Sequence, residues 1–147
     1  QGHTLQLVVF GEKLEDPQSL FDAAGFDFEY HYRPAGEELR KIYTSCDIFL
    51  CSSWYEGLGM TAMEAMACRC SLVTTDTGGC LEYAIDEQTA LVSASRDING
   101  LSRNLIRLLE DEALLKSLSE SGYLKINEFS WDESCDQLLR LFNESLT

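Results

Sequence analysis

Two glutamates flank a glycine turn in the middle of the chain, and this loop holds the residue types best suited to chemistry. It reads SSWYEGLGMTAME over residues 52–64, so Glu56 and Glu64 enclose Gly57 and Gly59. Glycines allow a ligand to approach the backbone closely, and the free amides at a helix start suit a phosphate. The two carboxylates can accept hydrogen bonds from hydroxyl groups. The pattern therefore indicates a site for a ligand that carries both phosphate and sugar hydroxyls.

Simpler interpretations of the same residues stay open at this point. Thr61-x-x-Glu64 has the form of a capping box, in which the glutamate only reaches back to the amide of Thr61. Glu56 could be a solvated loop acid, and the glycines could simply form a tight turn. The aromatic residues Trp54 and Tyr55 could stack on a ligand ring, or they could pack in the core.

Strands and helices alternate around this loop. Apolar runs predict strands at residues 5–10, 26–32, 48–51, 71–75 and 89–92. Helical spacing and capping residues predict helices at residues 17–24, 37–46, 61–68, 81–85, 97–110 and 111–127, and from residue 130 onwards. This order predicts the α/β class, with a Rossmann-like parallel sheet, helices on both faces and additional C-terminal helices. Ligands bind such sheets at the carboxyl ends of the strands, which is where the loop after Cys51 lies.

The composition excludes several classes of function. The chain has 147 residues, of which 45% are hydrophobic, so it fits one domain with a sizeable core. It has 11 basic and 25 acidic residues and a net charge of −14, which disfavours binding to nucleic acid or to an anionic membrane. No apolar run approaches the roughly 18 residues of a membrane span.

The six cysteines indicate a reducing compartment rather than a metal site. No two of them form a C-x-x-C pair, and most lie in apolar runs. The spacing of Cys68-x-Cys70 is too tight for a usual zinc knuckle, and only His3 and His31 could add imidazole. We expect reduced thiols in a cytoplasmic protein and no bound metal.

Three runs of sequence resemble the retaining glycosyltransferases of family 4, which have the GT-B fold. Glu56-x7-Glu64, within EGLGMTAMEAMA at residues 56–67, looks like the E-x7-E signature of that family. The run ELRKIYTSCDIFL at 38–50 is similar to the helix and strand before the motif. The run TTDTGG at 74–79 resembles the next strand and its Gly-Gly turn. The similarity extends over nearly all of the chain after Leu5.

The resemblance implies a role for each matched position. Glu64 would bind the ribose of a nucleotide-sugar donor, and Glu56 would act at the transferred sugar as the catalytic carboxylate. Backbone groups of the turn would meet the sugar and the diphosphate, at Gly57, Leu58, Gly59, Met60 and Thr61. Arg33 and Pro34 would lie against the base. The reaction would retain the anomeric configuration. The sequence contains no Asp-x-Asp, so a divalent metal that bridges the diphosphate is not expected.

The chain also departs from the family pattern. The family has a further strand and helix before residue 5, which carry an Arg and a Lys that clamp the diphosphate, and an N-terminal acceptor domain. Lys13, Arg33 and Arg69 match neither clamp residue and are interpreted as solvated surface charges. We interpret residues 1–3 as a cloning scar and 4–147 as the nucleotide-sugar domain. Without the strand that the family places between 5–10 and 48–51, those strands must pair directly, expose their edges or borrow a strand from a partner.

The sequence thus predicts the donor-binding half of a glycosyltransferase that turns over poorly by itself. Its expected partners are a nucleotide-sugar donor, an acceptor held by the N-terminal domain, and a second copy at an exposed sheet edge. The alternative is a non-catalytic α/β module that keeps the half-fold for binding or assembly.

Overall fold

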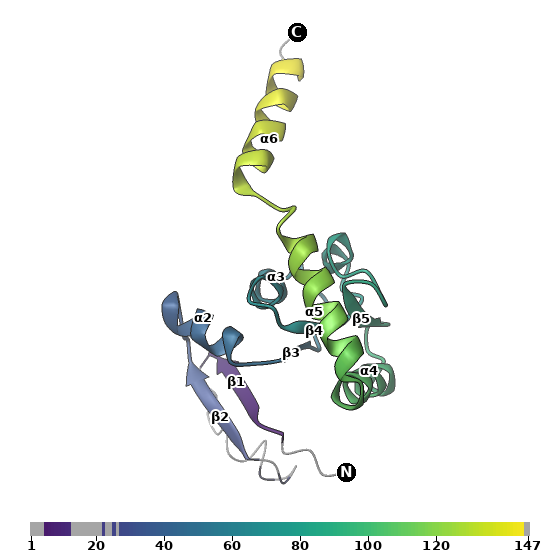
Figure 1. Cartoon of the computed structure of the whole chain (residues 1–147). Coiled ribbons are helices and arrows are strands. Elements are labelled where there is room, and N and C mark those ends of the chain that lie inside the picture. The colour runs from purple at the N-terminus through teal and green to yellow at the C-terminus, as the bar shows by residue number, and fades with distance from the viewer. Residues whose placement is uncertain (1–4, 13–21, 23–24, 26, 146–147) are drawn as a thin grey trace. The chain divides into compact units, whose positions relative to one another are not determined.

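The computed structural model describes residues 5–12, 22, 25 and 27–145 (Figure 1). The chain divides into two compact units, one of residues 1–46 and one of residues 47–147. Each unit has its own parallel sheet, so each is described by itself.

The described residues of the first unit form a two-stranded sheet and one helix. Strands β1 (Leu7–Gly11) and β2 (Phe28–Tyr32) pair in parallel, and helix α2 (Glu37–Thr44) follows them. Phe10 of β1 meets Tyr43 of α2 edge to face, with ring centroids 5.6 Å apart. The helix predicted at residues 17–24 lies almost entirely outside the described residues.

The second unit is built on a three-stranded parallel sheet. Its strands are β3 (Ile48–Cys51), β4 (Ser71–Thr75) and β5 (Ala90–Ser93), hydrogen-bonded in that order. Every residue of the central strand β4 is buried. The bounds of β3 and β4 confirm the prediction of two short strands from apolar runs between turn signals. Strand β4 is covered on both faces, whereas Leu50 of β3 is exposed.

Helices cover both faces of this sheet, as predicted. The remaining elements of the body are α3 (Met60–Ala67), the 3-10 turn η1 (Gly79–Glu82), α4 (Ile98–Glu110) and α5 (Glu112–Ile126). Leu72 of β4 and Ala90 of β5 face α3 and η1. The next residues along these strands, Val73 and Leu91, face α4 and α5. Alternation along a strand sends successive side chains into these two apolar clusters.

The predicted α/β class with parallel strands is confirmed, and the strands form two sheets, one in each unit. Within the described residues β1 pairs only with β2, and β3 pairs only with β4. In each unit a strand takes as its partner the next described strand along the chain through a parallel crossover. The three arrangements considered for the strands at 5–10 and 48–51 stay predictions.

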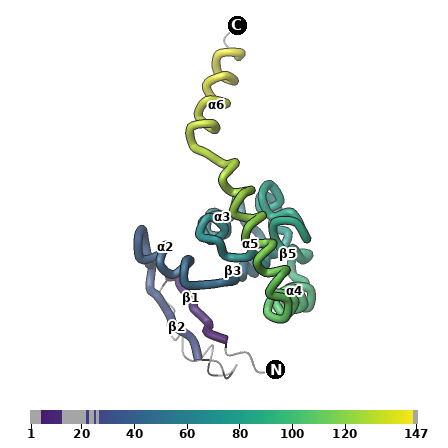
Figure 2. The backbone as a smooth tube through the Cα atoms, in the orientation of Figure 1, coloured from purple at the N-terminus to yellow at the C-terminus, as the bar shows by residue number. Residues whose placement is uncertain are grey.

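Helices α4 and α5 each begin at an aspartate whose side chain caps the first turn, at the residue where the sequence predicts the helix to start. The carboxylate of Asp97 accepts from the amide of Gly100, and that of Asp111 accepts from the amide of Leu114, each over 2.9 Å. Helix α6 (Trp131–Ser145) follows α4 and α5 along the backbone (Figure 2). All of its residues are exposed, including its apolar stripe. None of the helices in the described part of the chain is long and apolar enough to cross a membrane.

Candidate functional site

The loop between β3 and α3 turns sharply at a glycine, and the helix starts directly after it. Gly59 is the N-cap of α3 and has a φ of +77°, a left-handed conformation that favours glycine. Its carbonyl oxygen accepts from the amides of Ala62 and Met63 over 3.0 and 3.3 Å. Helix α3 begins at Met60, one residue before the predicted start, so Thr61 lies inside the helix. The capping-box interpretation of Thr61 and Glu64 is therefore wrong.

The first-turn amides of α3 are available to a ligand. Within the described part of the chain, the amides of Met60 and Thr61 donate to no backbone carbonyl. The first amides of a helix have no partner inside it, and they lie at the positive end of the helix dipole. This arrangement is suited to an anionic group such as a diphosphate.

The two glutamates lie on either side of these amides along the chain. Glu56 is half-buried in the loop, and its carboxylate accepts a hydrogen bond from the Ser53 hydroxyl over 2.7 Å. The Ser53 carbonyl in turn accepts from the hydroxyl of Thr75 at the end of β4. Glu64 lies one turn into α3 and is exposed. Glu56 is thus held by the ends of two strands, rather than being the freely solvated loop acid of the simpler interpretation.

The Gly-Gly turn after β4 packs directly against the loop. A Cβ on Gly79 would lie 1.9 Å from the carbonyl oxygen of Gly57, a distance that no side chain can occupy. Gly78 pairs with Glu56 in an isolated parallel bridge and has a φ of +95°. These contacts explain structurally why residues 78 and 79 are glycines, and they fix the path of the loop backbone at Glu56 and Gly57.

Tyr83 supports the loop from the core and was missed in the sequence. Its ring is fully buried, and its hydroxyl donates to the Gly59 carbonyl over 3.1 Å. Burial raises the pKa of the Tyr83 phenol well above its ordinary value, so this group is a neutral donor. A tyrosine 24 residues after a loop gives no local signal of such a contact.

Comparison with known proteins agrees with this geometry. Residues 1–125 match the family described as glycosyl transferases group 1. The chain belongs to the glycosyl transferases group 1 family. It is 28% identical over 141 residues to a D-inositol 3-phosphate glycosyltransferase of Salinispora arenicola, covering 92% of this chain and 32% of that protein. The chain therefore spans about a third of the length of that relative.

Solved structures of the family share the fold of this chain. The C-terminal domain of a group 1 glycosyl transferase from Francisella tularensis superposes with a TM-score of 0.67 at 25% identity, covering 76% of this chain and 58% of that one. The Anabaena protein HepE, solved in complex with UDP-glucose, superposes with a TM-score of 0.78 at 16% identity, covering 94% of this chain and 40% of that one. The predicted resemblance to the C-terminal half of a GT-B glycosyltransferase is confirmed.

Two of the three basic residues interpreted as surface charges lie in the described part of this group 1 chain. Arg33 follows β2 in the first unit, where its Nε lies 3.3 Å from a carboxylate oxygen of Glu12 and Pro34 comes next. Arg69 ends α3 with a φ of +69°, pairs with Glu120 and stacks on Tyr123. The Arg69 side chain is 51% exposed, which agrees with a surface charge, although it also contacts Glu120 and Tyr123 of α5. Lys13 lies outside the described residues.

The aromatic residues of the loop do not pack in the core. Trp54 is 65% exposed and Tyr55 is 86% exposed, so the packing interpretation is wrong for both. None of the six cysteines, all of which lie in the described residues, forms a disulfide, and Cys70 and Cys80 are buried. Among the described residues no group of three or more His, Cys, Asp or Glu could hold a metal ion.

Proposed function

We propose that this chain is the donor-binding part of a retaining glycosyltransferase, which transfers a sugar from a nucleotide diphosphate sugar to an acceptor. The observation that carries the proposal is the start of α3. The amides of Met60 and Thr61 have no backbone acceptor in the described residues, and Glu56 and Glu64 lie on either side of them along the chain. An anionic group and a hydroxyl-rich group therefore find complementary partners in one short segment.

The chemistry assigned to these groups is electrostatic. When the bond to the transferred sugar breaks, negative charge develops on the leaving diphosphate, and the α3 amides and helix dipole would stabilise it. Glu64 would accept hydrogen bonds from the ribose. Glu56, oriented by Ser53, would hold hydroxyls of the transferred sugar. Gly57 and Leu58 would contact that sugar through the backbone, and Arg33 with Pro34 would lie on the base side. We propose no protein nucleophile and no metal.

Two features of the comparisons support this assignment. The Salinispora relative is named a glycosyltransferase, and the Anabaena structure with the same fold holds UDP-glucose. Transfer also needs an acceptor beside the donor. We assign that role to an N-terminal acceptor domain, and therefore expect residues 1–147 alone to transfer sugar slowly or not at all. A cytoplasmic location is part of the proposal, and it is supported by the six cysteines, none of which forms a disulfide in the described residues.

The deciding experiment is a calorimetric titration of the protein with UDP, GDP, ADP and their sugars. The expected result is saturable binding of one nucleotide class, which is lost in Glu64→Ala. Glu110→Ala is the matched control, because it removes one exposed carboxylate from the last position of α4 and should bind as the wild type does. If a folded sample binds no nucleotide at all, the donor site is refuted and the non-catalytic module is the better account.

A further inference from the structure

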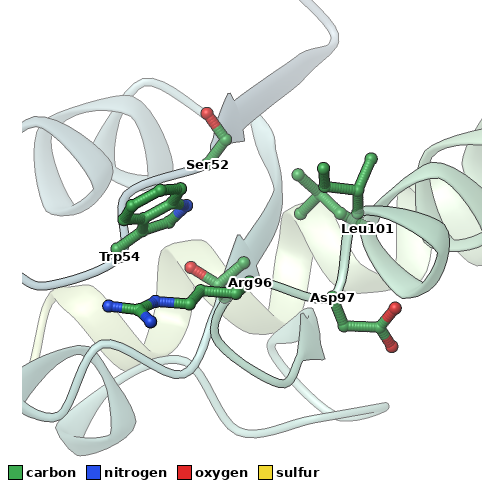
Figure 3. Close-up of a pocket in the computed structure, with 7 residues that line it drawn as sticks. Ser52, Trp54, Arg96, Asp97 and Leu101 are labelled. Carbon is green, nitrogen blue, oxygen red and sulfur yellow. The ribbon is translucent and has the colours of Figure 1, made fainter.

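A second concave site lies beside the donor loop, at the carboxyl ends of the same strands. We call it the Trp54–Arg96 pocket, and Figure 3 shows side chains that line it. Its volume is about 220 Å³. Its lining comes from the segments that follow β3, β4 and β5: Ser52, Trp54, Thr75, Arg96, Asp97, Ile98 and Leu101. The volume is below the ~300 Å³ at which sites for drug-sized ligands begin, so it suits a single ring rather than a nucleotide.

The pocket offers a cation that has no carboxylate partner. Five other arginines of the described residues pair with carboxylates: Arg33, Arg40, Arg69, Arg103 and Arg107. Within the described part of the chain Arg96 makes no such pair, and its guanidinium lies 4.8 Å from the centroid of the Trp54 ring. In a chain with net charge −14, an arginine held on an aromatic face with its N–H groups unpaired is suited to an incoming anion.

The neighbouring carboxylate is engaged elsewhere. One oxygen of Asp97 caps α4 through the Gly100 amide at 2.9 Å, and the other lies 3.8 Å from Arg103. In Figure 3 the Arg96 side chain runs beneath the Trp54 ring, and its guanidinium points away from Asp97. The cation and its closest acid in the chain therefore do not neutralise each other.

The rest of the lining suits a sugar ring. The indole of Trp54 is 65% exposed, and aromatic faces contact the C–H faces of rings. The Ser52 hydroxyl can donate or accept at the rim of the pocket. Ser95 donates to the Trp54 carbonyl over 2.9 Å, so the segment that carries Arg96 is tied to the loop that carries Trp54. Arg96 itself has a φ of +68°, which fixes an uncommon backbone conformation at the pocket.

The pocket lies next to the loop that holds Glu56, and this location indicates whether a ring bound there belongs to the donor or to the acceptor. Ser52 and Trp54 flank Ser53, whose hydroxyl holds Glu56 at 2.7 Å. We propose that the Trp54–Arg96 pocket binds one ring of a sugar acceptor that carries a phosphate or carboxylate group, while the N-terminal acceptor domain would hold the rest of that acceptor. The assignment of this ring to the acceptor rests on the proposed function. The anionic group lies on the Arg96 guanidinium, and the ring lies against the indole.

The test is a titration of the protein in its full natural length with four probes: glucose 6-phosphate, glucuronate, glucose and inorganic phosphate. We expect saturable binding of glucose 6-phosphate or glucuronate, and the arm that binds identifies the anionic group. The loss of a charge-assisted hydrogen bond should weaken that binding about tenfold or more in Arg96→Gln. Trp54→Ala should weaken it similarly, and Trp54→Phe should restore part of it. Lys116→Ala, which removes one exposed charge on α5, should leave it unchanged.

Three results would overturn the proposal: no binding of either anionic sugar, undiminished binding in Arg96→Gln, or inorganic phosphate binding as tightly as glucose 6-phosphate. A parallel titration with UDP-glucose separates this proposal from the donor site. Arg96→Gln should bind a donor as the wild type does. If the wild type binds a donor but no anionic sugar, the pocket assignment is wrong and the proposed function stands. If neither the wild type nor any variant binds a donor, the proposed function is wrong.

Discussion

The Tyr83 hydroxyl donates a hydrogen bond to the carbonyl oxygen of Gly59 over 3.1 Å, and so ties the buried core to the residue that caps α3. The same carbonyl accepts from the amides of Ala62 and Met63. Gly59 directly precedes the amides of Met60 and Thr61, at which we propose that the diphosphate binds. The position of these amides therefore depends on the side chain of Tyr83, the residue that directly follows η1. Tyr83 is a positioning residue for the donor loop.

Tyr83→Phe should weaken the attachment of the loop at Gly59 without leaving a cavity in the core. It removes one hydrogen bond and leaves the ring, so we expect a loss of about 1 kcal/mol in the free energy of unfolding. The same amount expressed as donor affinity is a weakening of about fivefold. Calorimetric donor titration and urea unfolding measure the two effects. Tyr123→Phe on α5 is the control, and unchanged donor affinity in Tyr83→Phe would contradict the positioning role.

Alkaline pH should destabilise the fold through the same residue. Burial raises the pKa of folded Tyr83 above the ordinary value of about 10 that the unfolded chain has. Its contribution to stability is therefore fully present below pH ~10 and is lost as the pH rises further, because only the unfolded state then releases the proton. Unfolding midpoints across this range should fall less steeply in Tyr83→Phe than in the wild type. Tyr55→Phe, at a side chain that is 86% exposed, should follow the wild type.

Gly79→Ala should disrupt the donor loop. The added Cβ would lie 1.9 Å from the Gly57 carbonyl oxygen, so the backbone must move. We expect a loss of about 3 kcal/mol in unfolding free energy, at the upper end of ordinary substitutions. Gly57→Ala is the matched control, since nothing lies within 4 Å of its Cβ. It should keep its stability and lose donor affinity, because the extra methyl group would face the sugar. Equal stabilities of the two variants would refute this packing argument.

Local signals in the sequence predicted the elements that carry the site. The strands β3 and β4 have the predicted bounds because their apolar runs end at turn residues. The caps Asp97 and Asp111 were predictable because an N-cap acts on an amide three residues away. Glu56 and Glu64 were found from their spacing and from the family resemblance. Their assigned roles remain predictions.

Contacts between distant residues could not be predicted. The start of α3 at Met60 depends on the left-handed Gly59, and no local pattern distinguishes this residue from Thr61 as the cap. The stacking of Arg96 on Trp54 joins residues 42 positions apart, and it depends on β3 and β5 lying in one sheet. The division into two sheets was likewise not visible, because every strand has the same apolar pattern whichever neighbour it pairs with.

The side-chain contacts of Arg69 should offset the cost of its left-handed backbone conformation after α3. It has a φ of +69° and meets Glu120 and Tyr123 of α5. Arg69→Ala loses these contacts and keeps the strained backbone, so we expect a loss of about 1 kcal/mol. Arg69→Gly loses the same contacts but relieves the strain, which recovers about 1 kcal/mol. Urea unfolding should therefore rank Arg69→Gly close to the wild type and above Arg69→Ala, and equal values for the two variants would exclude the strain.

Ser53 should matter for catalysis through Glu56 rather than through contact with the substrate. Its hydroxyl donates to the Glu56 carboxylate over 2.7 Å, and its carbonyl accepts from Thr75 at the end of β4. Ser53→Ala removes the first bond and keeps the second, so the fold should lose only about 1 kcal/mol. In the full-length protein we expect kcat to fall by about tenfold with donor KM little changed, because we propose that Glu56 acts at the sugar and not at the nucleotide. Ser53→Thr keeps the hydroxyl and should restore most of kcat. A rise in donor KM with unchanged kcat in Ser53→Ala would instead place Glu56 in ground-state donor binding.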